Sequence, residues 1–152
     1  MHANVIEIHS PVEATGLTFV RIDKNKPGQG LEIGRKVAEI IPIAKVIVVV
    51  DQDIDIYDRQ QVLFALGSRW QAQPATAIIP ELRGMPLDPS LTNRPMTSKA
   101  VIDATRQWPE EGGPEVYPDT NISLLQKLAP EAFARVDADW RRLVGAYRPP
   151  GW

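Results

Sequence analysis

Residues 45–58 form one continuous stretch, which reads Lys45-Val46-Ile47-Val48-Val49-Val50-Asp51-Gln52-Asp53-Ile54-Asp55-Ile56-Tyr57-Asp58. The run from Val46 to Val50 is β-branched throughout and too short for a helix, which is typical of a central strand covered on both faces. The acidic segment from Asp51 to Asp58 predicts a loop at the end of that strand, and Asp58 is suited to cap the helix that follows. We therefore expect a layered α/β fold.

The chain on the N-terminal side of this stretch predicts two more strands and a helix. Strand-forming residues dominate Val5–His9 and Leu17–Ile22. From Leu31 to Ile41 the apolar residues recur at helical spacing, with charged residues on the opposite face, and Pro42 ends the helix. Strands that alternate with helices in this way favour a parallel or mixed sheet with helices packed on it.

The chain beyond the acidic loop predicts a second helix, two strands and a long loop. The helix has an apolar stripe made of Val62, Leu63 and Leu66. Ala75–Ile79 is predicted as a strand that ends at Pro80, and Leu82–Pro95 as a long loop of the kind that is often functional. A short edge strand is expected at Ala100–Ile102.

The final third of the chain is predicted to be mostly helical. Prolines, adjacent glycines and glutamates mark residues 106–120 as an irregular connection, and residues 121–148 as the helical part, in which Pro130 starts a helix. One face of this helix carries Phe133, Val136, Trp140, Leu143 and Tyr147. With residues 1–15 as a lead-in strand and turn, we expect residues 1–152 to form a single three-layer α/β/α domain with a mixed or mostly parallel sheet and a C-terminal helix.

The composition argues against several classes of function. The 152 residues carry 19 acidic and 17 basic side chains, a formal net charge of −2, so no positive field favours nucleic acid or an anionic membrane surface. There is no cysteine, which rules out disulfides, thiolate zinc sites and cysteine nucleophiles. The N-terminus lacks the apolar core of a signal peptide, and the longest apolar stretch is too short to span a bilayer. We expect a cytoplasmic protein.

A pattern of glycines imitates a dinucleotide fingerprint. Gly28, Gly30 and Gly34 lie between a predicted strand and a helix, and Asp51 ends the next strand. The fit is imperfect, because several residues separate the first glycine from its strand and the glycine spacing is one residue too long. A turn and a helix start explain the same glycines, so a small nucleotide-binding domain remains a minor alternative.

The acidic loop is a second candidate site. It carries Asp51, Asp53, Asp55 and Asp58. Acids at alternate positions can collect a hard cation, but a calcium loop would next require glycine, and Ile56 stands there. Because Ile54 and Ile56 alternate with the acids, an extended segment with one buried and one solvated face is the simpler interpretation. We predict no metal ligand, and no catalytic residue, since the serines lack a nucleophile elbow.

Separate blocks of the sequence carry a more specific signal. The blocks are Arg21–Gln29, Lys45–Asp58 with Val62–Leu66 and Ser68–Arg69, Ile78–Pro80 with Gly84–Ser90, and Ser98–Thr105. In this order, and over about residues 16–145, they resemble the C-terminal domain of the UbiD family of prenylated-FMN-dependent (de)carboxylases. Gln52 and the pair Ala100-Val101 depart from the residues usual in that family.

This resemblance implies a function. In the family, the region that precedes the C-terminal domain binds prenylated flavin mononucleotide with its metal ions and holds the catalytic residues. We therefore expect a small subunit that binds no cofactor alone, pairs with a large flavin-binding subunit and self-associates through this domain. The complex would catalyse the reversible, non-oxidative decarboxylation of an aromatic or α,β-unsaturated carboxylic acid, and this chain would provide assembly and closure of the active site.

The resemblance also implies contacts near the cofactor phosphate. Lys45, just before the central strand, is the chosen candidate for a contact with the flavin phosphate, and Lys24 and Lys26 are its rivals. Exposed apolar groups in Leu82–Met96 and on the C-terminal helix are expected to face the partner. The alternative from another class is a non-catalytic oligomerisation or regulatory module.

Overall fold

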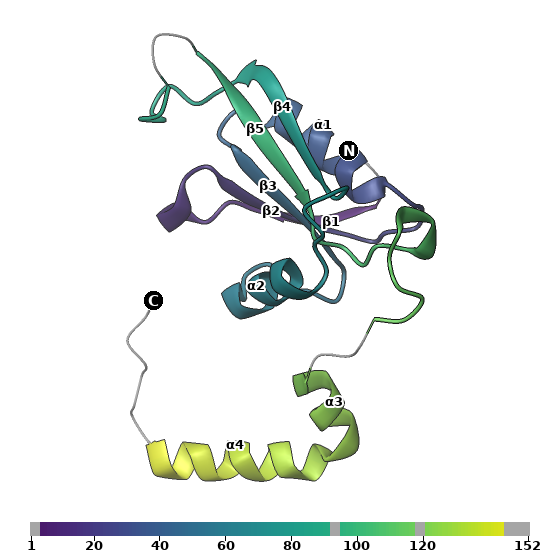
Figure 1. Ribbon diagram of the computed structural model, residues 1–152. Coiled ribbons are helices and arrows are strands. Elements are labelled where there is room, and N and C mark those ends of the chain that lie inside the picture. The colour runs from purple at the N-terminus through teal and green to yellow at the C-terminus, as the bar shows by residue number, and fades with distance from the viewer. Residues whose placement is uncertain (1–3, 92–94, 118–120, 145–152) are drawn as a thin grey trace. The chain divides into compact units, whose positions relative to one another are not determined.

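A mixed five-stranded sheet lies at the centre of residues 1–115, the first of two units of the chain (Figure 1). The computed structural model describes residues 4–91, 95–117 and 121–144. The strands are β1 (Val5–His9), β2 (Leu17–Ile22), β3 (Val46–Asp51), β4 (Thr76–Arg83) and β5 (Met96–Asp103). Their spatial order is β1-β2-β3-β5-β4, in which β2, β3 and β5 are parallel and the edge strands β1 and β4 are antiparallel to their neighbours. The predicted α/β fold with a mixed sheet is confirmed.

The central strand β3 is buried on both faces, as its sequence predicts. Ile47 and Val49 belong to the core that includes side chains of α1 (Gln29–Ile40). Val48 and Val50 belong to the core that includes side chains of α2 (Arg59–Ser68). All four side chains are at most 2% exposed. The two helices therefore cover opposite faces of the sheet and form the outer layers of the predicted α/β/α arrangement (Figure 1).

Helix α1 starts and ends close to its predicted limits. Gly28 precedes it with a φ of 71°, in the left-handed region that glycine adopts without strain. At the other end the N–H of Ile41 donates to the carbonyl oxygen of Val37 (2.9 Å), and Pro42 follows. Proline cannot continue a helix because it lacks an N–H, so the helix stops where the sequence indicates.

The close approach of α1 to the sheet depends on Gly34. A methyl group added there would lie 2.2 Å from Val101 Cγ1 and 3.1 Å from Val49 Cγ2. Both neighbours are fully buried β-branched residues, which have little freedom to move aside. Gly34 is therefore a packing residue, required where the helix crosses β3 and β5.

Strand β4 is longer than predicted. It continues through Pro80 to Arg83, so the prediction that Pro80 ends the strand is wrong. Because β4 is an edge strand, one of its sides has no ladder partner among the described residues, and a residue without an N–H is tolerated there. The pairing with β5 shifts register between Ile79 and Leu82, where Glu81 has a φ of 57°.

Strand β5 is not the edge strand predicted at Ala100–Ile102, because it spans Met96–Asp103 and lies between β3 and β4. Lys99 accounts for part of the error, since it is only 1% exposed. Its ammonium donates to the carbonyl oxygens of Ala38 (2.7 Å) and Ile41 (2.8 Å). These carbonyls lie at the C-terminal end of α1, where unpaired oxygens and the helix dipole favour a cation.

Helix α2 confirms the predicted cap but only part of the predicted stripe. Asp58 Oδ1 accepts from the N–H of Gln60 (2.9 Å), which satisfies a donor of the first helical turn. Val62 is 2% exposed, but Leu63 is 59% exposed, and Ala65 is the second fully buried residue. The helix thus packs through smaller side chains than expected, so Leu63 is wrongly placed in the stripe.

The second unit, residues 116–152, contains the helices α3 (Asn121–Leu128) and α4 (Pro130–Val144), which contact each other. Pro130 begins α4 as predicted. Val136 and Trp140 of the predicted apolar face are 62% and 59% exposed, while the side chains of Leu143 and Tyr147 fall outside the described part. Among the described residues, no helix has both the length and the apolar character needed to cross a membrane.

Replacing Gly34 with alanine is expected to lower the free energy of unfolding by about 1–3 kcal/mol, because the methyl group would overpack the core. Gly67 in α2 offers a matched control, since a methyl group there meets nothing within 4 Å. Gly67→Ala should raise the free energy of unfolding by up to about 1 kcal/mol through helix propensity. Urea denaturation followed by circular dichroism measures both, and equal effects of the two substitutions would contradict the packing role of Gly34.

Candidate functional site

Charged side chains gather at the carboxyl ends of the parallel strands β2, β3 and β5. Lys24 follows β2, Asp51 ends β3 and Asp103 ends β5. Open α/β sheets usually bind ligands at this edge, close to the point where successive helices leave for opposite faces. In this sheet α1 follows β2 and packs on one face, whereas α2 follows β3 and packs on the other face. This edge is therefore the first place to look for a site.

Two arginines neutralise the start of the acidic loop. The side chain of Arg69 is 3% exposed and donates to Asp51 Oδ2 (2.9 Å) and to both carboxylate oxygens of Asp53 (2.9 and 2.8 Å). Arg106 donates from its backbone N–H to Asp51 Oδ2 and from its guanidinium to Asp53 Oδ2, both at 2.7 Å. Bidentate pairing of this kind fixes orientation as well as charge. The carboxylates of Asp51 and Asp53 are therefore already bound by Arg69 and Arg106.

The two carboxyl groups respond differently to these partners. Burial dominates at Asp51 and raises its pKa, although the N–H of Arg106 and the charge of Arg69 oppose the shift. Burial also favours the neutral form of Asp53, but the hydrogen bonds and charges of the two arginines outweigh it and lower the pKa. Asp53 is thus firmly ionised, and an external cation would have to compete with two guanidinium groups for it.

The rest of the acidic loop serves the backbone. Asp55 Oδ1 accepts from the N–H of Tyr57 (2.9 Å), and Asp58 caps α2. Ile54 and Ile56 are 2% and 1% exposed, so they are buried as predicted, but the segment is not extended. The N–H of Ile54 donates to the carbonyl oxygen of Asp51, and the N–H of Asp58 to that of Asp55 (both 3.2 Å), which makes two turns. Within the described ranges, no three acidic or histidine side chains are grouped closely enough to hold a metal ion. Capping and ion pairing therefore account for these acids.

Lys24 lies in a second polar cluster at the same edge of the sheet. Its ammonium donates to Thr105 Oγ1 (3.0 Å), to the carbonyl oxygen of Arg106 (2.9 Å) and to Glu111 Oε2 (2.6 Å), and its side chain is 2% exposed. An ammonium has three donors, and all three are used here. Lys24 can therefore donate to a phosphate only if it gives up one of these bonds.

Glu111 occupies the N-terminal end of α1. Its Oε1 accepts from the N–H of Gly28 and its Oε2 from the N–H of Trp108, both at 2.7 Å. A methyl group on Gly30 would lie 2.2 Å from the carboxylate carbon of Asp103. A nucleotide phosphate would need the same place, because it binds at a helix N-terminus beside glycines. Two protein carboxylates oppose it there, so the glycine pattern reflects packing and capping.

Lys45 lies at the opposite end of the sheet from Lys24. It precedes β3, whereas Lys24 follows β2, and the two strands pair in parallel along their whole length. At about 3.3 Å per residue, this separates the two lysines by roughly 20 Å. The ammonium of Lys45 donates to Asp88 Oδ2 (2.8 Å) and to Ser90 Oγ. The hydrogen bond from Lys45 and the one from the N–H of Ser90 stabilise the ionised carboxylate of Asp88 and lower its pKa to about 2.

The three lysines selected from the sequence do not converge on one site. Lys26 is exposed and pairs with Glu32 (2.6 Å), so each of the three is engaged with a carboxylate. A flavin phosphate is held by several donors that point to one place, and these three lysines do not form such a group. By themselves the three lysines do not fit the phosphate of prenylated FMN. Lys45 as a phosphate contact stays a prediction.

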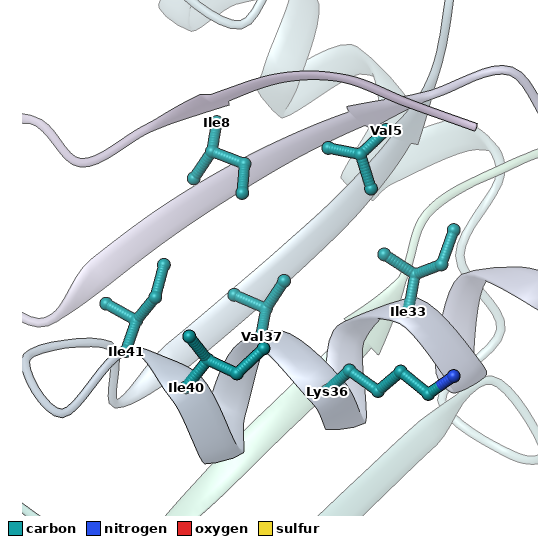
Figure 2. A pocket seen from close by; sticks show the side chains of 7 residues that line it. All are labelled: Val5, Ile8, Ile33, Lys36, Val37, Ile40 and Ile41. Carbon is teal, nitrogen blue, oxygen red and sulfur yellow. The ribbon is translucent and has the colours of Figure 1, made fainter. Parts of the chain in front are cut away.

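An apolar groove of about 570 Å³ lies between β1 and α1 (Figure 2). It is lined by Val5, Ile8, Ile33, Lys36, Val37, Ile40 and Ile41. In Figure 2 the two side chains of β1 point toward the helix, and the apolar side chains of α1 point back toward the strand. Sequence reasoning missed this groove, because each element alone has the pattern of an ordinary amphipathic strand or helix.

Sequence reasoning also missed Arg69, Arg106 and Glu111. The arginine partners depend on which segments the sheet brings together, and no local pattern reports that. Glu111 had a usable signal: it ends the short 3-10 helix η2 (Pro109–Glu111), in which proline comes first and an acid third. That arrangement is a known helix-start pattern, and the acid reaches back to the N–H of the residue before the helix.

Replacing Glu111 with glutamine is expected to weaken the acid dependence of stability. Burial favours the neutral form of Glu111, but its hydrogen bonds from Lys24 and from the N–H groups of Trp108 and Gly28 outweigh it, so the pKa lies below 4.5. The unfolded chain therefore binds more protons in acid. The stabilisation is present above about pH 4.5 and is lost as the pH falls through the folded-state pKa.

Urea denaturation between about pH 3 and pH 7 measures this effect. The stability of the wild-type chain should fall more steeply in acid than that of the Glu111→Gln variant. Glu110→Gln, an exposed neighbour in η2, is the matched control and should leave the wild-type profile unchanged. Parallel profiles for wild type and Glu111→Gln would show that the carboxylate does not stabilise this edge.

The chain matches a known family over its first 104 residues. Residues 1–104 match the model UbiD_C, the 3-octaprenyl-4-hydroxybenzoate carboxy-lyase C-terminal domain. An uncharacterized protein of Archaeoglobus fulgidus is 30% identical over 147 residues, which cover 94% of this chain and 30% of that protein. The resemblance seen in the sequence blocks is therefore confirmed.

Two solved structures share the fold. The closed form of the vanillic acid decarboxylase of Sedimentibacter hydroxybenzoicus is 25% identical, with a TM-score of 0.69 over 86% of this chain and 29% of that one. The UbiD-class enzyme HmfF from Pelotomaculum thermopropionicum, solved in complex with FMN, is 25% identical, with a TM-score of 0.63 over 79% of this chain and 28% of that one. This chain spans less than a third of each relative. Its fold, its family match and these relatives agree that the chain belongs to the UbiD family and has the fold of that family's C-terminal domain.

Proposed function

We propose that this chain is the small subunit of a split UbiD-type decarboxylase and works with a large subunit that carries prenylated FMN. One observation carries the proposal: the chain has the family's C-terminal domain, yet the three lysines selected as phosphate contacts each pair with a carboxylate of this chain and do not converge. The family relative HmfF was solved with FMN and extends far beyond this domain. In the proposed complex, the cofactor belongs to that remaining part of the enzyme.

The proposed reaction is the reversible, non-oxidative decarboxylation of an aromatic or α,β-unsaturated carboxylic acid. The family model is named after a hydroxybenzoate, and one relative acts on vanillic acid, so an aromatic acid is the first substrate class to test. The cofactor supplies the chemistry when it is bound. The small subunit contributes assembly of the complex and closure over the active site, which excludes water from the reaction.

The carboxyl edge of the sheet is suited to such a closing role. Its charges are held by buried ion pairs, from Arg69 to the acidic loop and from Lys24 to Glu111. These pairs connect the ends of β2 and β3 to the segments that follow α2 and β5, and the hydrogen bond from the N–H of Gly28 to Glu111 adds the start of α1. A surface fixed in this way can approach a partner as a rigid body, and no side chain has to be reordered first.

Native mass spectrometry of the tagged chain, purified from its own host, tests the proposal. We expect a larger flavoprotein to be retained, with a ligand mass that corresponds to prenylated FMN, and the complex to release carbon dioxide from an aromatic acid. Neither subunit alone should be active. A homo-oligomer without flavin or partner would contradict the proposal and favour the assembly module. Turnover by this chain alone would also contradict it.

A further inference from the structure

The groove between β1 and α1 exists because α1 does not cover the whole sheet. Among the described elements, the main contacts of α1 with strands are those with β3, β5 and β4. Strand β1 is the edge strand on the other side of β2. Its α1-facing side therefore projects beyond the helix, and the side chains of Val5 and Ile8 line the opening (Figure 2).

An irregularity in β1 puts both of these side chains on the same face. Val5 pairs with Ile22 and Ile8 pairs with Val20, and both partners belong to the core shared with α1. In a regular strand, residues three positions apart would point to opposite faces. The register shift between Val5 and Glu7 removes that difference. The irregularity therefore places one more branched aliphatic side chain on the face of the sheet that α1 covers.

The groove has a closed floor and an open rim. Ile33 and Val37 are 1% and 6% exposed, whereas Ile8 and Ile40 are 37% and 76% exposed. Lys36 is the one charged residue of the lining, and the stem of a lysine is itself apolar. Branched aliphatic walls without converging polar groups suit an aliphatic protein segment better than a polar ligand, which would need donors and acceptors to orient it.

We propose that this groove is the docking surface for the large subunit, filled by a segment whose aliphatic side chains contact Ile8 and Ile40. The inference rests on the proposed function. The matched family is a C-terminal domain, and most of each relative's length lies outside it. Because the matched model is a C-terminal domain, the rest of such a polypeptide precedes the segment that corresponds to residues 1–104, and in this chain that segment begins with β1. In a split enzyme the covalent link is gone, so buried apolar surface has to replace it.

A second copy of this chain fits the groove less well. A two-fold dimer brings the same surface of each copy together, so that surface has to complement itself. Two facing grooves would leave a void between their floors, with the loss of packing that a void entails. A convex aliphatic segment from a different polypeptide fills the groove instead. The shape therefore disfavours a groove-to-groove dimer, and the match to a C-terminal domain, whose relatives extend far beyond it, favours the large subunit.

The double variant Ile8→Thr/Ile40→Gln tests the docking surface. It is titrated with the purified flavoprotein that the native mass spectrometry identifies. The dissociation constant should rise by roughly tenfold or more, because two aliphatic side chains lose their burial. Both replacements keep the local preference, since threonine is β-branched and glutamine is a good helix former. Circular dichroism and urea denaturation verify that the variant folds.

Two exposed residues elsewhere provide matched controls. Ile78 on β4 is 65% exposed and Leu63 on α2 is 59% exposed, and neither lines the groove. The variant Ile78→Thr/Leu63→Gln makes the same kinds of change at these other sites. It should bind the flavoprotein with the wild-type dissociation constant. An equal loss of affinity for the flavoprotein in both double variants would contradict the proposal that the groove is the docking site.

Photo-crosslinking identifies the occupant directly. With p-benzoylphenylalanine in place of Ile40, we expect a cross-link to an aliphatic segment of the large subunit. A cross-link to a second copy, or a lipid mass that only the wild type retains, would overturn the inference. If wild type binds the flavoprotein and the groove variant binds equally well, the docking surface alone is wrong. If wild type binds no flavoprotein, the proposed function fails as well.

Discussion

The burial of β3 on both faces is the constraint on which the remaining structure depends. Its side chains enter two separate cores, so one helix has to lie on each face of the sheet. The helix on one face comes so close that position 34 has to be glycine. The strand also carries Asp51 into a buried position at its end, and a buried carboxylate needs a partner. Arg69 and the backbone of Arg106 meet that need, and the ion pairs at this edge follow from it.

The elements around β3 could be predicted because local periodicity encodes them. Alternation and helical spacing gave β1, β2 and α1, and Asp58 marked the start of α2. The errors arose where tertiary context changed the meaning of a residue. Pro80 lies on an edge strand that does not need its N–H, and Lys99 is buried because its ammonium caps the end of α1. No pattern in a short window contains that information.

The site could be predicted less completely than the family. Ordered blocks identified the UbiD resemblance, because several weak signals in the right order are specific when taken together. The lysines were chosen by type and position, and burial decides how each is used: Lys24 is enclosed by its partners, while Lys45 lies at the other end of the sheet beside Asp88. The groove arises because β1 contains an irregularity and because α1 does not cover this edge strand. Both are properties of the assembled fold.

The position of β5 between β3 and β4 has a consequence for the synthesis of the chain. β3 pairs with β5, as Val48 does with Ile102, so one side of the most apolar strand stays unpaired until residues near 103 have left the ribosome. β4 is made earlier but has no neighbour until β5 is inserted. Non-local pairing of this kind forms slowly and exposes strand edges meanwhile. The nascent chain therefore passes through a period of aggregation risk that ends when β5 joins the sheet.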